Sequence, residues 1–282
     1  MINSIQEYEN FFNSEIVRFD KYPTKGTLDP RIVNDNGIYS LRGFINGVMN
    51  YEQWKKEKMR ICFLLKEPVM KKEEYEATDD HACHNQRKEF SNYVINDFLD
   101  EDNKTYVGII YISYFLWYLL QDFPIPENFN ENKAIEIFRN NVCILNTNWF
   151  PSYGGKSDDK LIWHWAQRNM ENLYDQYKFF NPTLLIGAHT LTHLNNPKDN
   201  NHGNLFNQIP VKILTSPLLS KILSKESPWG NTNHTYFSST KEIFINTYHP
   251  SLINYDKGKA LEYAKDIKTI YNWIKDRKGE IQ

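Results

Sequence analysis

The sequence is short of cysteine, of net positive charge and of long apolar runs, and each shortage excludes a class of protein. Three cysteines in 282 residues are too few for the disulfide framework of a secreted protein. Cys62 and Cys143 lie in apolar runs, where we expect them to act as small core residues. The N-terminal segment, MINSIQEYENFFNSE, lacks the basic start and apolar stretch of a signal peptide. We therefore expect a cytoplasmic protein.

No apolar run has the length of a membrane span. The most apolar stretch, residues 107–120 (VGIIYISYFLWYLL), contains three tyrosines and a serine, and a membrane-spanning helix needs about 20 apolar residues. We expect a buried or half-buried helix there and no membrane partner. The formal net charge of −2 gives the chain no overall attraction to a phosphate backbone. Any binding of nucleic acid would depend on a local site.

The chain does contain alternating strand and helix patterns, without repeats or low-complexity tracts. Nearly continuous apolar runs, typical of parallel strands buried on both faces, occupy residues 60–65, 141–145, 183–186 and 243–246, with a weaker fifth run at 211–214. Apolar residues at helical spacing occupy residues 89–99, 105–121, 133–139, 161–177 and 257–275. This order predicts one domain over residues 1–282, a three-layer α/β/α fold with a central four-stranded or five-stranded, mostly parallel sheet.

Polar residues follow each predicted strand at its carboxyl end, which is where open α/β sheets bind their ligands. The first apolar run ends two residues before Glu67, the second directly before Asn146 and the last three residues before His249. The third run leads into Gly187 and His189. We expect these residues to meet at one edge of the sheet.

These groups suit cleavage of an N-glycosidic bond, in which positive charge grows on the sugar and negative charge on the departing base. The Glu67 carboxylate could activate water and stabilise the sugar cation. His249 could donate a hydrogen bond to the base oxygen. The amide of Asn146 could pair with the carbonyl and the imino proton of uracil, whereas cytosine presents the reverse pattern. This chemistry requires neither a metal nor a cofactor.

These blocks together resemble the uracil-DNA glycosylase superfamily. The sequence VCILNTNWF is similar to the block that carries the uracil-binding asparagine, FLLKEP to the water-activating block, NPTLLIGAHTLTHL to the third strand and its turn, and HPSLI to the block with the catalytic histidine and the DNA-penetrating side chain. The resemblance implies Glu67 and His249 as catalytic residues and Asn146 as the base-binding residue. It also implies a monomer that acts on single- or double-stranded DNA with the base flipped out.

The resemblance also implies further contacts. Trp149 or Phe150 would stack on the base, and the residues implied to contact DNA are Lys66, Gly187, His189, Ser251, Leu252 and Ile253. Two features depart from the family: Lys66 stands in a segment where a glycine is usual, and residues at about 195–239 form an insertion that could cover the substrate or bind a partner. Family members with an iron–sulfur cluster need four cysteines, and this chain has three.

Other interpretations remain. His81, Cys83 and His84 have the spacing of metal ligands, but no second pair completes a site, so we expect a loop without metal. The same pocket could serve a hydrolase of nucleosides or nucleotides, which the acidic charge balance favours slightly. A third alternative is a nucleic-acid-binding protein that kept the fold while Lys66 and Glu67 altered its chemistry.

Overall fold

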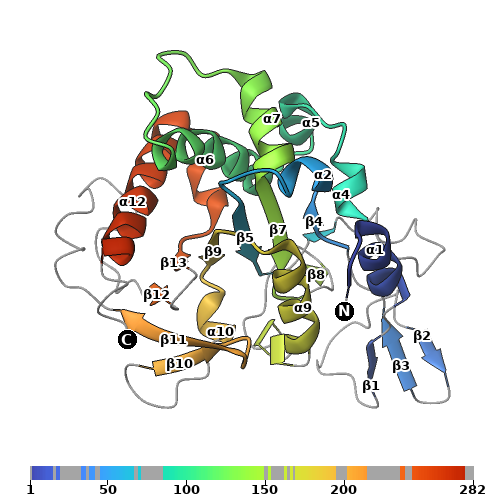
Figure 1. Cartoon of the computed structure of the whole chain (residues 1–282). Helices are drawn as coiled ribbons and strands as arrows, with labels where there is room; N and C mark the ends of the chain where they lie inside the picture. The colour runs from blue at the N-terminus through green and yellow to red at the C-terminus, as the bar shows by residue number, and fades with distance from the viewer. Residues whose placement is uncertain are drawn as a thin grey trace.

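A computed structural model of the chain describes residues 2–14, 17–19, 33–35, 38–41, 45–66, 69–70, 85–148, 152–153, 162–163, 166–167, 169–194, 202–214, 236–238 and 243–276. Its centre is an eight-stranded sheet with the strand order β10-β11-β12-β13-β9-β5-β7-β4 (Figure 1). The strands are β4 (Gly47–Val48), β5 (Ile61–Leu65), β7 (Val142–Asn146), β9 (Leu184–Ala188), β10 (His202–Leu205), β11 (Ile209–Leu214), β12 (Tyr236–Ser238) and β13 (Ile243–Thr247).

The four strongest apolar runs form the parallel centre of this sheet, as the sequence predicts. Strands β13, β9, β5 and β7 are adjacent and parallel, and every residue in them is buried. The weaker fifth run is also a strand, β11, but it is antiparallel to its neighbours and separated from the parallel centre by β12. The sheet is therefore parallel at its centre and antiparallel at both ends.

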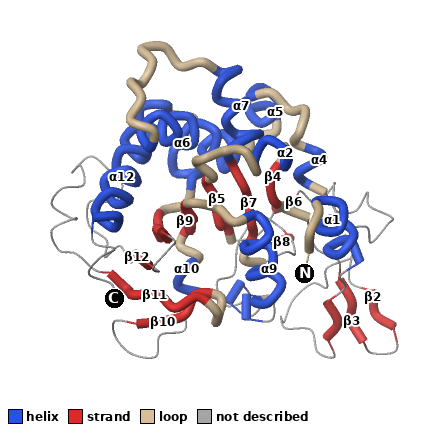
Figure 2. The backbone as a smooth tube through the Cα atoms, in the orientation of Figure 1, coloured by secondary structure: helices blue, strands red, loops and turns tan. Residues whose placement is uncertain are grey.

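Helices cover both faces of the sheet, which confirms the three-layer arrangement (Figures 1 and 2). One face packs against α5 (Ile95–Asp100), α6 (Lys104–Leu120), α7 (Glu131–Asn141) and α12 (Lys257–Asp276). The other face packs against α1 (Ile5–Ser14), α2 (Tyr51–Trp54), α9 (Met170–Phe180) and α10 (Leu191–Leu194). Cys62 and Cys143 are free and fully buried in this second core, as expected for small core residues. Two-sided burial explains why the central strands read as continuous apolar runs.

The predicted helix over residues 89–99 is instead two short helices, α4 (Gln86–Glu89) and α5, separated by a turn. The Asp97 carboxylate accepts a hydrogen bond from the backbone N–H of Val94 at 2.6 Å and so caps the start of α5. An acidic side chain near the first turn satisfies an otherwise unpaired N–H group and starts a new helix. The apolar spacing continues across this break because Phe90 and Phe98 enter the same core.

The described part of the predicted insertion belongs to the sheet. Residues 202–205, 209–214 and 236–238 form β10, β11 and β12, a set of antiparallel strands that extends the parallel centre beyond β13. Two smaller sheets lie outside the central one: β1 (Val17–Phe19), β3 (Ile38–Leu41) and β2 (Val33–Asp35) form one, and β6 (Val69–Met70) and β8 (Ser152–Tyr153) form the other.

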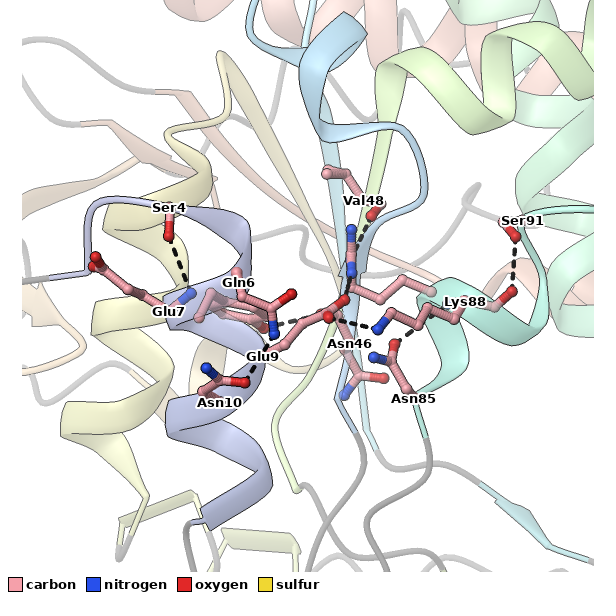
Figure 3. A network of polar contacts seen from close by, with 12 residues as sticks. Ser4, Gln6, Glu7, Glu9, Asn10, Asn46, Val48, Asn85, Lys88 and Ser91 are labelled. Atoms are coloured by element: carbon pink, nitrogen blue, oxygen red, sulfur yellow. Dashed lines mark hydrogen bonds and ion pairs between the residues drawn. The ribbon is translucent and has the colours of Figure 1, made fainter.

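A buried ion pair attaches the N-terminal helix to the rest of the fold (Figure 3). The carboxylate of Glu9 on α1 bonds to the guanidinium of Arg87 on α4, and its second oxygen lies 2.8 Å from Lys88 Nζ. Arg87 Nε also donates to the carbonyl of Val48 on β4 at 2.7 Å. Both Glu9 and Arg87 are buried, so removing one charge leaves the other without compensation.

We therefore expect Glu9→Gln to lower the free energy of unfolding by about 3 kcal/mol or more, because breaking a buried pair strands a charge. Urea denaturation measures this loss. The matched control is Glu52→Gln, which removes an exposed ion pair with Lys55 and should cost less than about 1 kcal/mol. Equal effects of the two substitutions would contradict the structural role of Glu9.

Candidate active site

The register of the parallel strands brings four carboxyl ends to one edge of the sheet. Leu65 on β5 is paired with Asn146 on β7, and Ala188 on β9 is paired with Thr247 on β13. The backbone N–H groups of Thr147 and Asn148 continue the pairing by donating to Leu65 and Lys66, each at 2.8 Å. The described residues at the carboxyl ends of these strands are therefore neighbours in space.

Asn146, the last residue of β7, is the most unusual polar residue at this edge. Its side chain is 2% exposed, and neither its amide nitrogen nor its amide oxygen has a hydrogen-bond partner among the described residues. Burying an amide without partners costs about 1–3 kcal/mol, and native proteins rarely accept this cost without a reason. A ligand that donates to the oxygen and accepts from the nitrogen would satisfy both atoms.

The side chain of Asn146 lies on the α6 and α12 face of the sheet. Side chains alternate between the two faces of a strand, and Val142 and Ile144 belong to the core beneath α6, α7 and α12. By the same alternation Thr247, at the end of β13, faces this side with Ile243 and Ile245. The segment that follows β13 crosses this same side of the sheet, because residues 250–253 pack against α6.

His249 begins the short 3-10 helix η1 (Pro250–Ile253), and its ring orientation is fixed by that helix. The backbone N–H of Ser251 donates to His249 Nδ1 at 3.3 Å, and Ser251 Oγ lies 2.8 Å from the same nitrogen. A backbone N–H can only donate, so Nδ1 must be the acceptor and the proton of the neutral ring must be on Nε2. The second nitrogen of His249 can therefore act as a hydrogen-bond donor.

Burial and, to a smaller extent, the nearby charges of Lys66 and His189 together lower the pKa of His249 to about 4. The folded protein therefore prefers the neutral ring at neutral pH. Because this pKa is below the usual value of 6.5, the unfolded state binds more protons between these two values. Stability that is present above about pH 6.5 should be lost as the pH falls towards 4.

We expect an NMR titration of the His249 ring to show a midpoint of about 4 and a proton on Nε2 at pH 7. The spectrum of His249→Gln assigns the resonance. A midpoint near 6.5, or a proton on Nδ1, would contradict the environment described above.

Two residues that the sequence did not single out hold this segment in place. Tyr263 on α12 donates to the carbonyl of Tyr248 at 2.7 Å, and its hydroxyl lies 2.6 Å from Thr247 Oγ1. Gly108 on α6 allows η1 to approach closely, because a Cβ atom there would lie 2.3 Å from the carbonyl oxygen of Pro250. A glycine within an apolar helix pattern is the only sequence signal for this contact.

We expect Gly108→Ala to destabilise the protein by about 1–3 kcal/mol, because the added methyl group clashes with backbone and not with a flexible side chain. Helix propensity alone predicts the opposite sign, a gain of about 1 kcal/mol. Thermal unfolding measures whether Gly108→Ala lowers or raises the stability of the protein. Ser113→Ala in the same helix is the control: Ser113 Oγ is buried without a partner among the described residues, so its removal should not destabilise.

The third predicted block has a packing role. Gly187 is buried in β9, and a Cβ there would lie 2.5 Å from Leu191 Cγ and 3.0 Å from Thr190 Oγ1. The glycine is needed for the tight turn from β9 into α10, and its contact with DNA stays a prediction. His189 is exposed, adopts a left-handed φ of 60° and places its ring 5.0 Å from that of Tyr248. Its exposed ring can still contact a ligand.

The two apolar residues of the HPSLI block differ sharply in exposure. Leu252 is 50% exposed, whereas Ile253 is 1% exposed and belongs to the core beneath α6 and α12. A short helical turn points neighbouring side chains in different directions, and here Ile253 points into the core, so its contact with DNA stays a prediction. Leu252 is the apolar side chain that the turn presents to solvent. Ser251 uses its hydroxyl and backbone N–H to orient His249.

Several predicted site residues lie outside the described residues: Glu67, Trp149 and Phe150, together with the possible metal ligands His81, Cys83 and His84. Two short described strands follow two of these gaps in the chain. β6 follows Glu67 and β8 follows Phe150, and these strands pair in parallel, Val69 with Ser152 and Met70 with Tyr153. The chain after β5 and the chain after β7 are therefore paired again at β6 and β8.

Within the described ranges, no three histidine, cysteine, aspartate or glutamate side chains are grouped as metal ligands. None of the described helices combines the length and the apolar composition needed to cross a membrane. Comparisons of this chain with protein-family models, with curated proteins and with solved structures find no match.

Proposed function

We propose that this protein is a DNA glycosylase of the uracil-DNA glycosylase type, which hydrolyses the N-glycosidic bond of uracil or a related base in DNA. One observation carries the proposal: Asn146 is buried at the carboxyl end of a central strand with both amide atoms unpaired among the described residues. An amide in this state suits a ligand edge that offers one donor and one acceptor side by side, as uracil does at its carbonyl and imino group.

The bond changes of the proposed reaction involve three groups of this chain. The bond between the sugar C1′ and the base nitrogen breaks, and its electron pair leaves with the base, which Asn146 holds. Neutral His249 donates from Nε2 to the base oxygen on which this charge collects. A water molecule adds to C1′ and gives up a proton, for which Glu67 is the proposed acceptor. The products are the free base and an abasic strand.

Leu252 supports DNA over a free nucleoside as the substrate. A base stacked in a duplex must rotate out before it reaches a buried amide, and proteins that open a stack often insert an apolar side chain. Leu252 is half exposed on the turn that also carries His249. A large apolar side chain exposed beside the reacting groups suits this role.

The proposal is tested by measuring base release from single- and double-stranded oligonucleotides that contain uracil, hypoxanthine, xanthine or 5-hydroxymethyluracil, with Glu67→Ala as the control variant. Deoxyuridine and its monophosphate are assayed in parallel. Release from an oligonucleotide by the parent but not by the variant supports the glycosylase. Release from the free nucleoside or nucleotide alone identifies the hydrolase alternative, and salt-dependent DNA binding without release identifies a binding protein.

A further inference from the structure

The turn that carries His249 and Leu252 ends in a left-handed stretch of backbone. Asn254 and Tyr255 follow η1 with φ angles of 49° and 65°, and α12 begins soon afterwards, at Lys257. Glycine adopts this conformation without steric cost, whereas a bulky residue such as tyrosine is strained there. Such strain persists only where surrounding contacts hold the residue, and it collects at functional positions. A side-chain partner is therefore expected for Tyr255.

That partner is Asp102, which follows α5 and is itself left-handed, with a φ of 52°. The hydroxyl of Tyr255 donates to Asp102 Oδ1 at 2.5 Å, and Lys104 Nζ lies 5.9 Å from the centre of the Tyr255 ring. Asp102 comes directly after the C-cap of α5, and the N–H of Asn103 bonds back to the carbonyl of Phe98 at 2.9 Å. Glycine is the usual residue in this helix-ending motif. An aspartate supplies a carboxylate that glycine lacks.

The bond between Asp102 and Tyr255 holds the end of a segment whose beginning is also held. The contacts of α12 and α6 described above fix that beginning, at Tyr248 and Pro250. The bond from Asp102 joins the end of α5 to the junction between η1 and α12. The segment is therefore tied to the helices on both sides of the exposed Leu252 side chain.

We propose that Asp102 and Tyr255 are positioning residues that hold Leu252 rigidly for insertion into double-stranded DNA. The role in DNA rests on the proposed function, whereas the rigidity of the turn does not. An apolar side chain that opens a base stack works against the stacking energy, and a turn that is already ordered loses little conformational entropy on binding. A base in a single strand needs less help to leave its neighbours. The pair should therefore matter most for a duplex substrate.

The first experiment measures hydrogen exchange, in the full chain, of three backbone N–H groups in the turn. Each donates to a carbonyl at 3.0 or 3.1 Å, and they belong to Leu252, Asn254 and Asp256. Tyr255→Phe keeps the ring and removes one hydrogen bond to a carboxylate, so we expect their exchange to be faster by about tenfold. Tyr93→Phe is the matched control, because Tyr93 donates to the Glu101 carboxylate at 3.0 Å without joining η1. Unchanged exchange in Tyr255→Phe overturns the inference.

Asp102→Gly provides a second variant in which a folding defect is not expected. It removes the carboxylate and places the usual residue at a left-handed position. We expect the turn to exchange as fast as in Tyr255→Phe, and Asp102→Asn, which keeps an acceptor, to show a smaller increase. If Asp102 serves only to end α5, the glycine variant should exchange no faster than the parent, and that result would contradict the pairing.

The second experiment compares base release from double- and single-stranded oligonucleotides that carry the base the parent releases. We expect Tyr255→Phe to lose about tenfold on the duplex and less than about twofold on the single strand. When Leu252 is already replaced by alanine, adding Tyr255→Phe should cause no further loss on the duplex, because the pair acts through Leu252.

Three outcomes overturn the role in duplex DNA: equal losses on the two substrates, a further loss in the Leu252→Ala background, or a parent that acts on single strands alone. If the parent releases no base from any substrate, the proposed function fails and the role in DNA fails with it. The exchange experiment still decides whether Asp102 and Tyr255 hold the turn.

Discussion

Asn146→Leu is expected to reduce base release by about three orders of magnitude or more, because the proposed base-binding site loses both of its hydrogen bonds at once. The substitution keeps a side chain of similar size, so the packing around position 146 is largely kept. Single-turnover release from a uracil-containing oligonucleotide measures the effect. Binding of the oligonucleotide should be largely retained, because phosphate contacts supply most of the affinity for DNA.

The same substitution should stabilise the protein, although it removes activity. Both amide atoms of Asn146 are buried without partners among the described residues, so replacing them with apolar atoms should raise the free energy of unfolding by about 1 kcal/mol or more. Asn141→Leu is the matched control, because Asn141 is also buried but donates to Glu57 and to the Met59 carbonyl, each at 3.0 Å. Replacing Asn141 should therefore lower the free energy of unfolding. Loss of stability in Asn146→Leu would show that the amide has a structural partner.

His249→Ala is expected to lower the rate of base release by about a hundredfold to a thousandfold, the usual effect of removing one donor to a developing anion. The residual activity should no longer depend on the ionisation of this ring. In the parent, a ring with a pKa of about 4 stays neutral from pH 5 to pH 8, so His249 should cause no fall in rate over that range.

His193→Ala is the control for this substitution. His193 lies on α10, whose buried residues belong to the core on the opposite face of the sheet, and its removal should leave the rate unchanged. An unchanged rate in His249→Ala would remove this residue from the mechanism. Equal losses in both variants would indicate a general effect on folding.

The sequence predicted the parallel centre of the fold because its strands are buried on both faces. Such strands appear as continuous apolar runs, so the amino-acid pattern alone places the residues that follow them at one edge of the sheet. The short strands β4 and β12, of two and three residues, carry too little pattern to be recognised. The turn between α4 and α5 was missed because Phe90 and Phe98 continue the apolar spacing across it.

The candidate site was only partly predictable, because its chemistry depends on contacts between distant segments. Composition and order identified Asn146 and His249, but they could not show that the amide of Asn146 lacks partners among the described residues or that Ser251 fixes the ring of His249. Nor could they separate Leu252 from Ile253, whose exposures of 50% and 1% follow from the packing of η1 on α6. Gly108 is informative only because Pro250 lies against it.

NMR of the side-chain NH₂ group of Asn146 during titration with free bases shows whether this amide is a receptor for a base. We expect uracil, or another base with an adjacent carbonyl and imino group such as xanthine, hypoxanthine or 5-hydroxymethyluracil, to shift this resonance, and cytosine to leave it unchanged. Absence of a shift with every one of these bases, or an equal shift with cytosine, would contradict this role of the amide.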